Sequence, residues 1–299
     1  MQIFHTDQFV LPLPDGHRFP MIKYAMLRER VKASGLCRGE ALRVPPAAAD
    51  GDLLRAHDDA YVQRVLSGNL TPQQVRAIGF PWTPQMVERS RRLIGATIEA
   101  CSAALAQGAA VSLAGGTHHA FRDRGAGYCV FNDAAVAALT MQDQGKVRRV
   151  LIVDCDVHQG DGTASILADD PSVFTFSIHA DRNYPFRKAQ SDLDLAMPDA
   201  VKDDAYLSAL ADGLHHSFSA SQPDLAIYLA GADPFEGDRL GRLSLSKRGL
   251  RERDEMVLST CADLRVPVAV VMAGGYARQI EDSVDIHFNT VSLASALFG

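Results

Sequence analysis

The stretch that decides the fold is residues 149–163, RVLIVDCDVHQGDGT. It opens on Val150, Leu151, Ile152 and Val153, an apolar run rich in β-branched side chains. Such a run is typical of a strand that is buried on both faces of a sheet. The run stops at Asp154, which is the first of several polar residues. The stretch therefore predicts a central strand that ends in a polar cluster.

The polar residues of this cluster are Asp154, Asp156, His158 and Asp161. Alternate residues of an extended chain point to the same side, so the spacing predicts that Asp156 and His158 converge on one metal ion. Three acids and a histidine beyond a hydrophobic strand are costly to bury unless they are paired or bind a cation. A solvated loop, with Asp161 as the N-cap of the next helix, is the simpler alternative. For the whole set a metal site is favoured.

The composition is that of an ordinary globular protein. A chain of 299 residues suits one large α/β domain or two small ones. Apolar residues make up 47% of it and charged residues 22%, which allows a sizeable buried core. The net charge of -6 and the pI near 5.9 argue against strong binding to nucleic acid through the overall electrostatic field.

The sequence predicts a soluble cytoplasmic protein. Its first residues, MQIFHTDQFV, lack the basic start and the long apolar run of a signal peptide. No stretch is apolar over a length that could span a membrane, so no membrane association is expected. The cysteines lack CxxC spacing, which argues against a disulfide framework and against a cysteine zinc site. They are Cys37, Cys101, Cys129, Cys155 and Cys261.

Apolar runs and helical patterns alternate along most of the chain. Strands are predicted at residues 2–5, 109–114, 150–153, 173–178, 225–230 and 266–272. Helical patterns occur at residues 21–32, 54–66, 72–78, 84–107, 133–144, 163–168, 204–219, 247–264 and 280–297. This alternation indicates a mostly parallel sheet with helices on both faces. With no repeat or linker in the sequence, residues 1–299 are expected to form a single domain.

Four of the predicted strands end in a polar or glycine-rich cluster. In sheets of this kind, ligands bind at the carboxyl ends of the strands. We therefore expect the four clusters to form one site. They are residues 115–119 (GGTHH), 154–161 (DCDVHQGD), 231–234 (GADP) and 274–276 (GGY).

The histidine doublets have different interpretations. His118 and His119 could be surface imidazoles, but they follow a buried strand and a Gly-Gly turn that lets backbone approach a ligand. A functional role is favoured for them. His215 and His216 lie within a helical pattern without nearby glycines, and we interpret them as structural.

Three further residues are open to two interpretations each. Asp233 precedes a proline and could be only a turn residue. Tyr276 could pack in the core, although the two glycines before it favour a functional role. Tyr128, in the loop at residues 125–132 (GAGYCVFN), could be a core side chain or a pocket wall.

Taken together, these motifs resemble the histone deacetylase family, which has the arginase-deacetylase fold. The matching segments are GGTHHAF, GYCVFND, VDCDVHQGDGT, FSIH, AGADPFEGD and AGGY, in the family's order over residues 109–276. A shorter segment near the start, LPLPDGHRFPMIKY, resembles the small class IV and bacterial branch. Any one segment is weak evidence, but the combination is specific.

The resemblance implies a catalytic metal centre. At the positions of Asp156, His158 and Asp233 the family holds a zinc ion, and iron(II) is a possible alternative. Three protein ligands leave coordination positions open, as in other catalytic zinc sites. A structural potassium ion is also implied near the zinc. Its ligands would be Asp154, Ser177 and the backbone carbonyls of Asp156, His158 and Ile178.

The resemblance also implies the catalytic groups. His118 and His119 would be the paired acid-base histidines, and His119 is expected to take the proton from water. Asp154 would hydrogen-bond His118, and Asp161 would hydrogen-bond His119, which would fix the tautomer of each ring. Tyr276 would donate a hydrogen bond to the developing oxyanion.

The implied activity is removal of an acetyl or other acyl group from the side-chain amine of lysine in a protein or peptide. The lysine side chain would enter a narrow tunnel, with either Tyr184 or Phe186 as its second aromatic wall. Many family members carry an acidic residue on a rim loop that grips the substrate backbone, whereas residues 69–87 contain no Asp or Glu. The other expected substrate-binding residues are Gly127, Tyr128, Gly274 and Gly275.

Three other functions fit parts of the sequence. An acetylpolyamine amidohydrolase, or another hydrolase of small acylated amines, would use the same catalytic set behind a different entrance. A ureohydrolase of the same fold needs two metals, whereas Pro234 and Phe235 follow Asp233 here in place of a second aspartate. A non-catalytic acyl-lysine-binding module would be expected to lack Tyr276 or a metal ligand. Acyl-chain length, native metal and oligomeric state stay open.

Overall fold

In a computed structural model, the chain is described at residues 1–36 and 41–299. Within these ranges eight strands form one sheet, in the order β2-β1-β3-β8-β7-β4-β5-β6, and every neighbouring pair is parallel. Cys37 lies outside the described residues. The strands are β1 (Gln2–Phe4), β2 (Leu42–Arg43), β3 (Ala109–Ser112), β4 (Val150–Asp154), β5 (Val173–Ala180), β6 (Leu193–Met197), β7 (Leu225–Ala230) and β8 (Val268–Met272).

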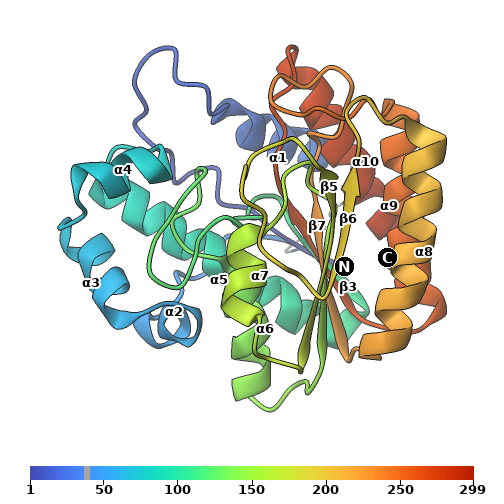
Figure 1. Cartoon of the computed structure of the whole chain (residues 1–299), viewed down its shortest axis with the longest axis horizontal. Helices are drawn as coiled ribbons and strands as arrows, with labels where there is room; N and C mark the ends of the chain where they lie inside the picture. Colours follow the sequence, from blue (N-terminus) through green and yellow to red (C-terminus); the bar gives the residue numbers. More distant parts are fainter. Residues whose placement is uncertain (37–40) are drawn as a thin grey trace.

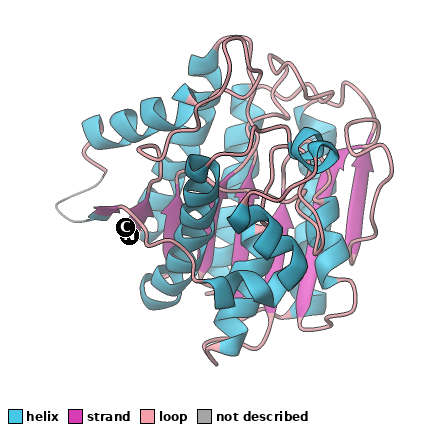
Figure 2. Cartoon of the chain, turned by 90° about the vertical axis from the view of Figure 1, so that its left-hand side faces the viewer, coloured by secondary structure: helices cyan, strands magenta, loops and turns pink. Residues whose placement is uncertain are grey.

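Helices cover both faces of the sheet (Figures 1 and 2). The helices α2 to α7 lie on one face, and α1, α8, α9 and α10 lie on the other. None of the described helices is both long enough and apolar enough to cross a membrane. In the described ranges they are α1 (Ile22–Ala33), α2 (Asp50–Ala56), α3 (Asp59–Ser67), α4 (Pro72–Ile78), α5 (Pro84–Gln107), α6 (Asp133–Asp143), α7 (Asp161–Leu167), α8 (Asp203–Ser221), α9 (Lys247–Asp263) and α10 (Ile280–Phe298).

The side chains of β4 divide between two hydrophobic cores. Val150 and Ile152 pack in the core that includes α5 and α6. Leu151 and Val153 point the other way and pack in the core that includes α8 and α9. Because both faces of the strand are buried, its apolar residues form an unbroken run instead of alternating with polar ones. The predicted fold class, an α/β sheet with helices on both faces, is confirmed.

Several predicted boundaries shift in the structure. The strand predicted at 266–272 begins at Val268, and the one at 109–114 ends at Ser112. The helix predicted at 163–168 begins at Asp161, and its N-cap is Gly160, so the suggestion that Asp161 is a solvated N-cap is wrong. Asp161 is instead buried within the first turn.

Three features of the fold were not predicted. The helical pattern at 54–66 is two helices, α2 and α3, because the chain is extended at His57 between them. His57 is buried, and its ring hydrogen-bonds the carbonyl of Phe121 and the N–H of Asn132. These tertiary contacts therefore separate α2 from α3. The strands β2 and β6 are short edge strands whose side chains are mostly half-buried, so they lack the buried apolar run that reveals a central strand.

Candidate active site

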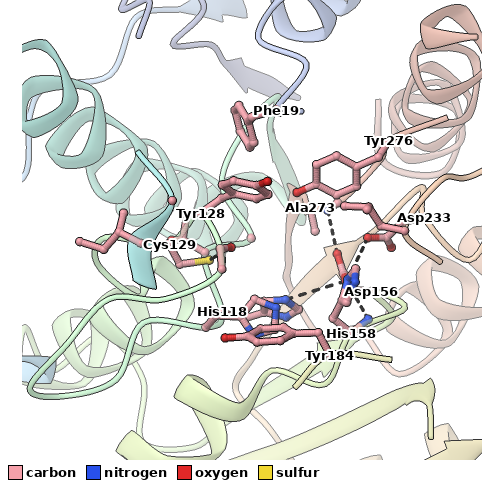
Figure 3. Close-up of a pocket in the computed structure, with 18 of the residues that line it drawn as sticks. Phe19, His118, Tyr128, Cys129, Asp156, His158, Tyr184, Asp233, Ala273 and Tyr276 are labelled. Atoms are coloured by element: carbon pink, nitrogen blue, oxygen red, sulfur yellow. Dashed lines mark hydrogen bonds and ion pairs between the residues drawn. The ribbon is translucent and has the colours of Figure 1, made fainter. Parts of the chain in front are cut away.

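The four clusters predicted at strand ends lie together in the structure. The strands β3, β8, β7 and β4 are neighbours, in that order, in the middle of the sheet. Because all strands are parallel, their carboxyl ends lie at the same edge, where ligands bind in such sheets. A cavity of about 670 Å³ opens there, and residues of all four clusters line it (Figure 3).

The predicted metal ligands Asp156, His158 and Asp233 form a compact buried group within this cavity. One potential ligand atom from each residue lies within 4.8 Å of the others. His158 Nδ1 lies 2.9 Å from Asp156 Oδ1 and 3.3 Å from Asp233 Oδ2. Two buried carboxylates that face one imidazole are stable only with a compensating positive charge among them.

The route by which Asp156 and His158 converge differs from the predicted one. The strand β4 ends at Asp154, and residues 156–158 form a bend, so the alternation of an extended chain is not the cause. The carboxylate of Asp154 accepts a hydrogen bond from the Asp156 N–H at 3.1 Å, and that of Asp156 accepts one from the His158 N–H at 2.9 Å. Two successive turns of this aspartate type therefore bring the side chains together.

The donor set of this group fits a divalent metal ion. Asp233 Oδ2 is buried and has no hydrogen-bond donor, which leaves it available to a cation. The other oxygens are held in place: Asp233 Oδ1 accepts from the Val157 N–H at 2.9 Å, and Asp156 Oδ2 accepts from the Gly274 N–H at 2.7 Å. Two carboxylates and one imidazole are ligands that zinc and iron(II) take in catalytic sites.

The pKa values of His158 and Asp233 are both shifted upward within this group. Burial lowers the pKa of His158, but its hydrogen bond with Asp156 and the nearby carboxylate of Asp233 outweigh this effect and raise it to about 10. Burial and the charge of Asp156 raise the pKa of Asp233 to about 7. Both shifts show that this group favours added positive charge, which a bound metal ion would supply.

His118 and His119 lie side by side, and each is backed by a carboxylate. Their ring centroids are 4.2 Å apart. His118 Nδ1 lies 2.6 Å from Asp154 Oδ2, and His119 Nδ1 lies 2.7 Å from Asp161 Oδ1. Donation of the Nδ1–H to a carboxylate fixes the tautomer and leaves Nε2 as the reactive nitrogen. The structure contains both hydrogen bonds that were expected from the resemblance.

The surroundings push the pKa values of the two histidines apart. Burial lowers the pKa of His118, but the charges of Asp154 and Asp156 raise it to about 9. Burial and the neighbouring His118 lower the pKa of His119 to about 4, in spite of Asp161. These shifts favour the neutral form of His119 and the protonated form of His118 near neutral pH. A general base needs the neutral state.

Tyr276 follows β8 and directs its hydroxyl into the cavity (Figure 3). Its backbone N–H donates to Asp238 Oδ2 at 2.6 Å, which holds the residue in place. Burial raises the pKa of the Tyr276 phenol well above its usual value. The hydroxyl therefore keeps its proton and can act as a hydrogen-bond donor.

A buried lysine that the sequence did not single out supports this loop. Lys23 Nζ donates to the carbonyls of Ala273 and Gly275 at 3.2 and 3.3 Å, and it lies 5.4 Å from the centroid of the Tyr276 ring. Lys23 is only 2% exposed. The signal in the sequence was its helical spacing, four residues before Leu27, on the buried face of α1.

A second residue that was not singled out, Asp133, holds the loop before the histidines. Its carboxylate accepts hydrogen bonds from the N–H groups of Gly116 and Thr117 at 3.0 and 2.7 Å. Asp133 is fully buried in the first turn of α6. It is the last residue of the GYCVFND segment, and a charged residue at the start of an apolar helical pattern was the available signal.

Aromatic side chains form two sides of the cavity. Tyr128 packs against Phe19 and Phe80, and both ring-centroid distances are 5.3 Å. Tyr184 packs edge-on against His119 at 4.9 Å, across the cavity from Tyr128 (Figure 3). Phe186 is 88% exposed and lies at the outer edge, so Tyr184 is the inner of the two candidate walls.

Glycines bring the cavity walls close to the reactive side chains. A Cβ on Gly127 would lie 2.7 Å from the His119 ring, and one on Gly274 would overlap the carboxylate of Asp233. Gly275 has φ +156° and packs against Ala232. A larger residue at Gly127 or Gly274 therefore would not fit without displacing the site. Their contact with a substrate stays a prediction.

The predicted potassium set shares Asp154 with the site, since Asp154 also bonds His118. Asp154 and Ser177 face each other in the pairing of β4 with β5, next to Ile178. The potassium ion that these residues would hold stays a prediction. His215 and His216 are exposed on α8 and do not line the cavity, in agreement with a structural role.

Comparison with known proteins identifies the family. The histone deacetylase domain matches residues 17–291. An uncharacterised protein of Picosynechococcus is 45% identical over 285 residues, which cover 95% of each chain. Histone deacetylase 2 of Arabidopsis thaliana is 29% identical over 282 residues, which cover 90% of this chain and 73% of that protein.

The fold has solved counterparts as well. The crystal structure of a histone deacetylase homologue from Aquifex aeolicus superposes with a TM-score of 0.85 at 22% identity, and it covers 98% of this chain and 83% of that chain. This likeness shows the arginase-deacetylase fold. Because the family match extends over nearly the whole chain and its motifs meet in one cavity, the chain belongs to the histone deacetylase family and is a hydrolase of the deacetylase type.

Proposed function

We propose that this protein is a zinc-dependent hydrolase that removes an acetyl or other acyl group from the side-chain amine of lysine in a protein or peptide. One observation carries the proposal: a group of metal ligands, two carboxylate-backed histidines and a tyrosine hydroxyl all face the same cavity. Water adds to the amide carbonyl and the C–N bond breaks. The products are a carboxylic acid and a free amine.

Asp156, His158 and Asp233 would hold the zinc, or iron(II) in its place. When bound, the ion supplies a Lewis acid that polarises the amide carbonyl and makes the attacking water more acidic. Two turns and the N–H of Gly274 hold Asp156 and His158 in position, and the N–H of Val157 holds Asp233. A structural potassium ion at Asp154 and Ser177 is a separate proposal, which rests on the resemblance to the family.

The other residues of the site move the protons and stabilise charge. His119 takes a proton from the attacking water and later delivers it to the departing nitrogen. Its hydrogen bond to Asp161 keeps Nε2 available for both transfers. Tyr276 donates to the carbonyl oxygen as that atom gains negative charge, which favours the transition state over the substrate. His118, held by Asp154, is the second member of the acid-base pair.

The shape of the cavity supports an acylated lysine as the substrate. The channel between Tyr128 and Tyr184 leads to the histidines, and Gly127 keeps it clear beside His119. Aromatic walls suit the apolar stem of a lysine side chain, whose four carbons would be buried there. A linear acylated amine therefore reaches the metal ligands with its carbonyl end first.

The direct test combines metal analysis with a substrate panel. We expect one zinc or iron per chain and faster hydrolysis of acetyl- or longer acyl-lysine peptides than of acetylated polyamines. Asp233→Ala, which removes a ligand, should lose both metal and activity. Two bridged metals per chain would favour a ureohydrolase. Hydrolysis of acetylated polyamines far faster than any acyl-lysine peptide would favour the small-molecule function.

We also propose that the protein acts in the cytoplasm. The cysteines of the described residues, Cys101, Cys129, Cys155 and Cys261, are all buried free thiols. Reducing compartments keep cysteines in this state. Cell fractionation tests the location, and recovery of the protein from an oxidising compartment would contradict it.

A further inference from the structure

The opening of the cavity carries charge of one sign. Apart from the metal ligands Asp156 and Asp233, no Asp or Glu of the described residues lines the cavity. Five exposed arginines do line it, and we call them the basic rim. They are Arg18, Arg76, Arg182, Arg239 and Arg242.

Separate segments of the fold bring these arginines together. Arg18 lies before α1, Arg76 lies on α4, and Arg182 follows β5. Arg239 and Arg242 lie in the segment after β7. A solvated helix face would explain several charges on one element, but it does not explain one sign of charge on four segments around a single opening.

Three arginines of the basic rim have no partner within residues 1–36 and 41–299. Arg18, Arg76 and Arg182 form no salt bridge or side-chain hydrogen bond there. By contrast, Arg242 pairs with Asp199 at 2.8 Å, and the Arg239 Nε–H donates to the Tyr276 carbonyl at 3.0 Å. The chain has 36 acidic and 30 basic residues, so the lack of acidic partners at this opening runs against its overall composition.

We propose that the basic rim binds carboxylates next to the acylated lysine, so that the substrate is an acidic segment of a peptide or protein. This inference rests on the proposed function and names its substrate class. A guanidinium binds a carboxylate through two parallel hydrogen bonds, and unpaired arginines are free to do so. A cleft lined by one sign of charge also concentrates substrates of the opposite sign.

The same charges exclude other substrates. An acetylated polyamine carries ammonium groups, and a segment rich in Lys and Arg carries the same sign of charge as the basic rim. Like charges at the opening slow the approach of both. Residues 69–87 also lack an acidic side chain that could attract them, and Arg76 lies in that segment instead.

The experiment compares three peptides with the same central acetyl-lysine and with Glu, Gln or Lys at the flanking positions. At low ionic strength, we expect kcat/KM to be about tenfold or more higher for the Glu peptide than for the Lys peptide, with the Gln peptide between them. The difference should shrink in 0.5 M salt, which shortens the Debye length to about 4 Å and so screens exposed charges. Equal rates, or a preference for the Lys peptide, would overturn the inference.

Charge-reversal variants locate the effect. In the double variant Arg76→Glu and Arg182→Glu, the preference for the Glu peptide should disappear or reverse. Arg251→Glu makes the same change on α9, outside the cavity lining, and should keep the preference. If the double variant keeps the wild-type preference for the Glu peptide, the basic rim does not select substrates by their charge.

Binding separates this inference from the proposed function. The same peptides with a fluorescent label should bind the zinc-loaded protein in the order Glu, Gln, Lys by anisotropy. If no peptide is hydrolysed, the proposed function fails, and the order of binding still decides the role of the basic rim. Faster hydrolysis of free Nε-acetyl-lysine, a small carboxylate, than of the Glu peptide would overturn the assignment to a peptide.

Discussion

His119 and Tyr276 face the same cavity but differ in what they can do for an amide. The Nε2 atom of His119 can accept a proton, because its Nδ1 atom is hydrogen-bonded to Asp161. Tyr276 has a hydroxyl that keeps its proton, because burial raises the pKa of the phenol. An amide needs both functions during hydrolysis: a base for the water and a donor for the carbonyl oxygen. Each can be removed separately by mutation.

Tyr276→Phe removes the donor and keeps the ring with its packing against Phe19 and Lys23. Turnover of an unactivated amide should fall by roughly 10²–10³, or about 3–4 kcal/mol, as for other lost oxyanion donors. Metal content and melting temperature should stay close to those of the wild-type protein. Near wild-type turnover would show that the hydroxyl of Tyr276 is not needed and that the residue is structural.

His119→Ala should abolish turnover and leave the metal content near normal, because His119 is not among the three proposed metal ligands. Atomic absorption on the purified variant measures the metal, and an acetyl-lysine peptide assay measures turnover. His118→Ala is the matched change on the neighbouring ring. Loss of metal together with activity would instead make His119 a ligand, and full activity would move the proton transfer to His118.

At the scale of elements, the ends of the central strands are fastened to one another by buried groups. Arg253 on α9 is fully buried and donates to the carbonyls of Cys155 and Gly231 at 3.3 and 2.6 Å. These carbonyls follow β4 and β7, next to Asp156 and near Asp233. The loop after β8 is tied to the same place, because the Gly274 N–H bonds Asp156. The segments after three strands thus hold one set of candidate metal ligands in place.

Gly274→Ala should disrupt this set without unfolding the sheet. The added Cβ would overlap Asp233 Oδ2 and lie 2.6 Å from Asp156 Oδ2, so the carboxylates must separate. We expect metal affinity to fall at least about tenfold, as it does when groups that orient metal ligands are lost. Competition with a chromogenic chelator measures this affinity.

Gly51→Ala is the control for this change, because a Cβ at Gly51 on α2 meets nothing within 4 Å. It should leave metal affinity unchanged. If Gly274→Ala binds metal as the control does, the close approach of this loop is not required for the site.

At the scale of the whole molecule, stability depends on pH through buried neutral histidines. His57 lies between α2 and α3 and ties them to the segment before α6, since its ring hydrogen-bonds the carbonyl of Phe121 and the N–H of Asn132. Burial lowers the pKa of His57 from 6.5 to about 4. Its Nε2 accepts the Asn132 N–H, so the folded protein requires the neutral ring.

The sign of the pH effect follows from the two states of His57. Above pH 6.5 neither the folded nor the unfolded chain protonates this ring, and its full contribution to stability is present. Between pH 6.5 and 4 only the unfolded chain takes up the proton, so the free energy of unfolding falls, by about 3 kcal/mol over this window. Below pH 4 the ring is protonated in both states, so His57 causes no further fall in the free energy of unfolding.

His57→Gln should make the free energy of unfolding less dependent on pH between 6.5 and 4, because glutamine does not titrate. Urea unfolding at a series of pH values measures this dependence. His215→Gln, at an exposed position on α8, should keep the pH dependence of the wild-type protein. An unchanged dependence in His57→Gln would show that other groups cause the loss of stability in acid.

Much of the fold and many residues of the site could be predicted because their signals are local. A strand buried on both faces needs an unbroken apolar run, and β4 and β7 were found by this property alone. Long helices such as α5 were bounded by the proline at their start and the glycine after their end. The strand-end clusters were recognised from short segments of consecutive residues, and these segments also indicated the family.

The sequence by itself therefore determined the α/β class, the chemical groups of the site and the family, because each of these depends on neighbouring residues. Only the tertiary structure decided that β3, β8, β7 and β4 lie side by side, since their order depends on packing between segments far apart in the chain. It also decided the turns that join Asp156 to His158 and the buried contacts of Lys23. The basic rim belongs to this second group, because its arginines come from four segments that share nothing except their place in the folded molecule.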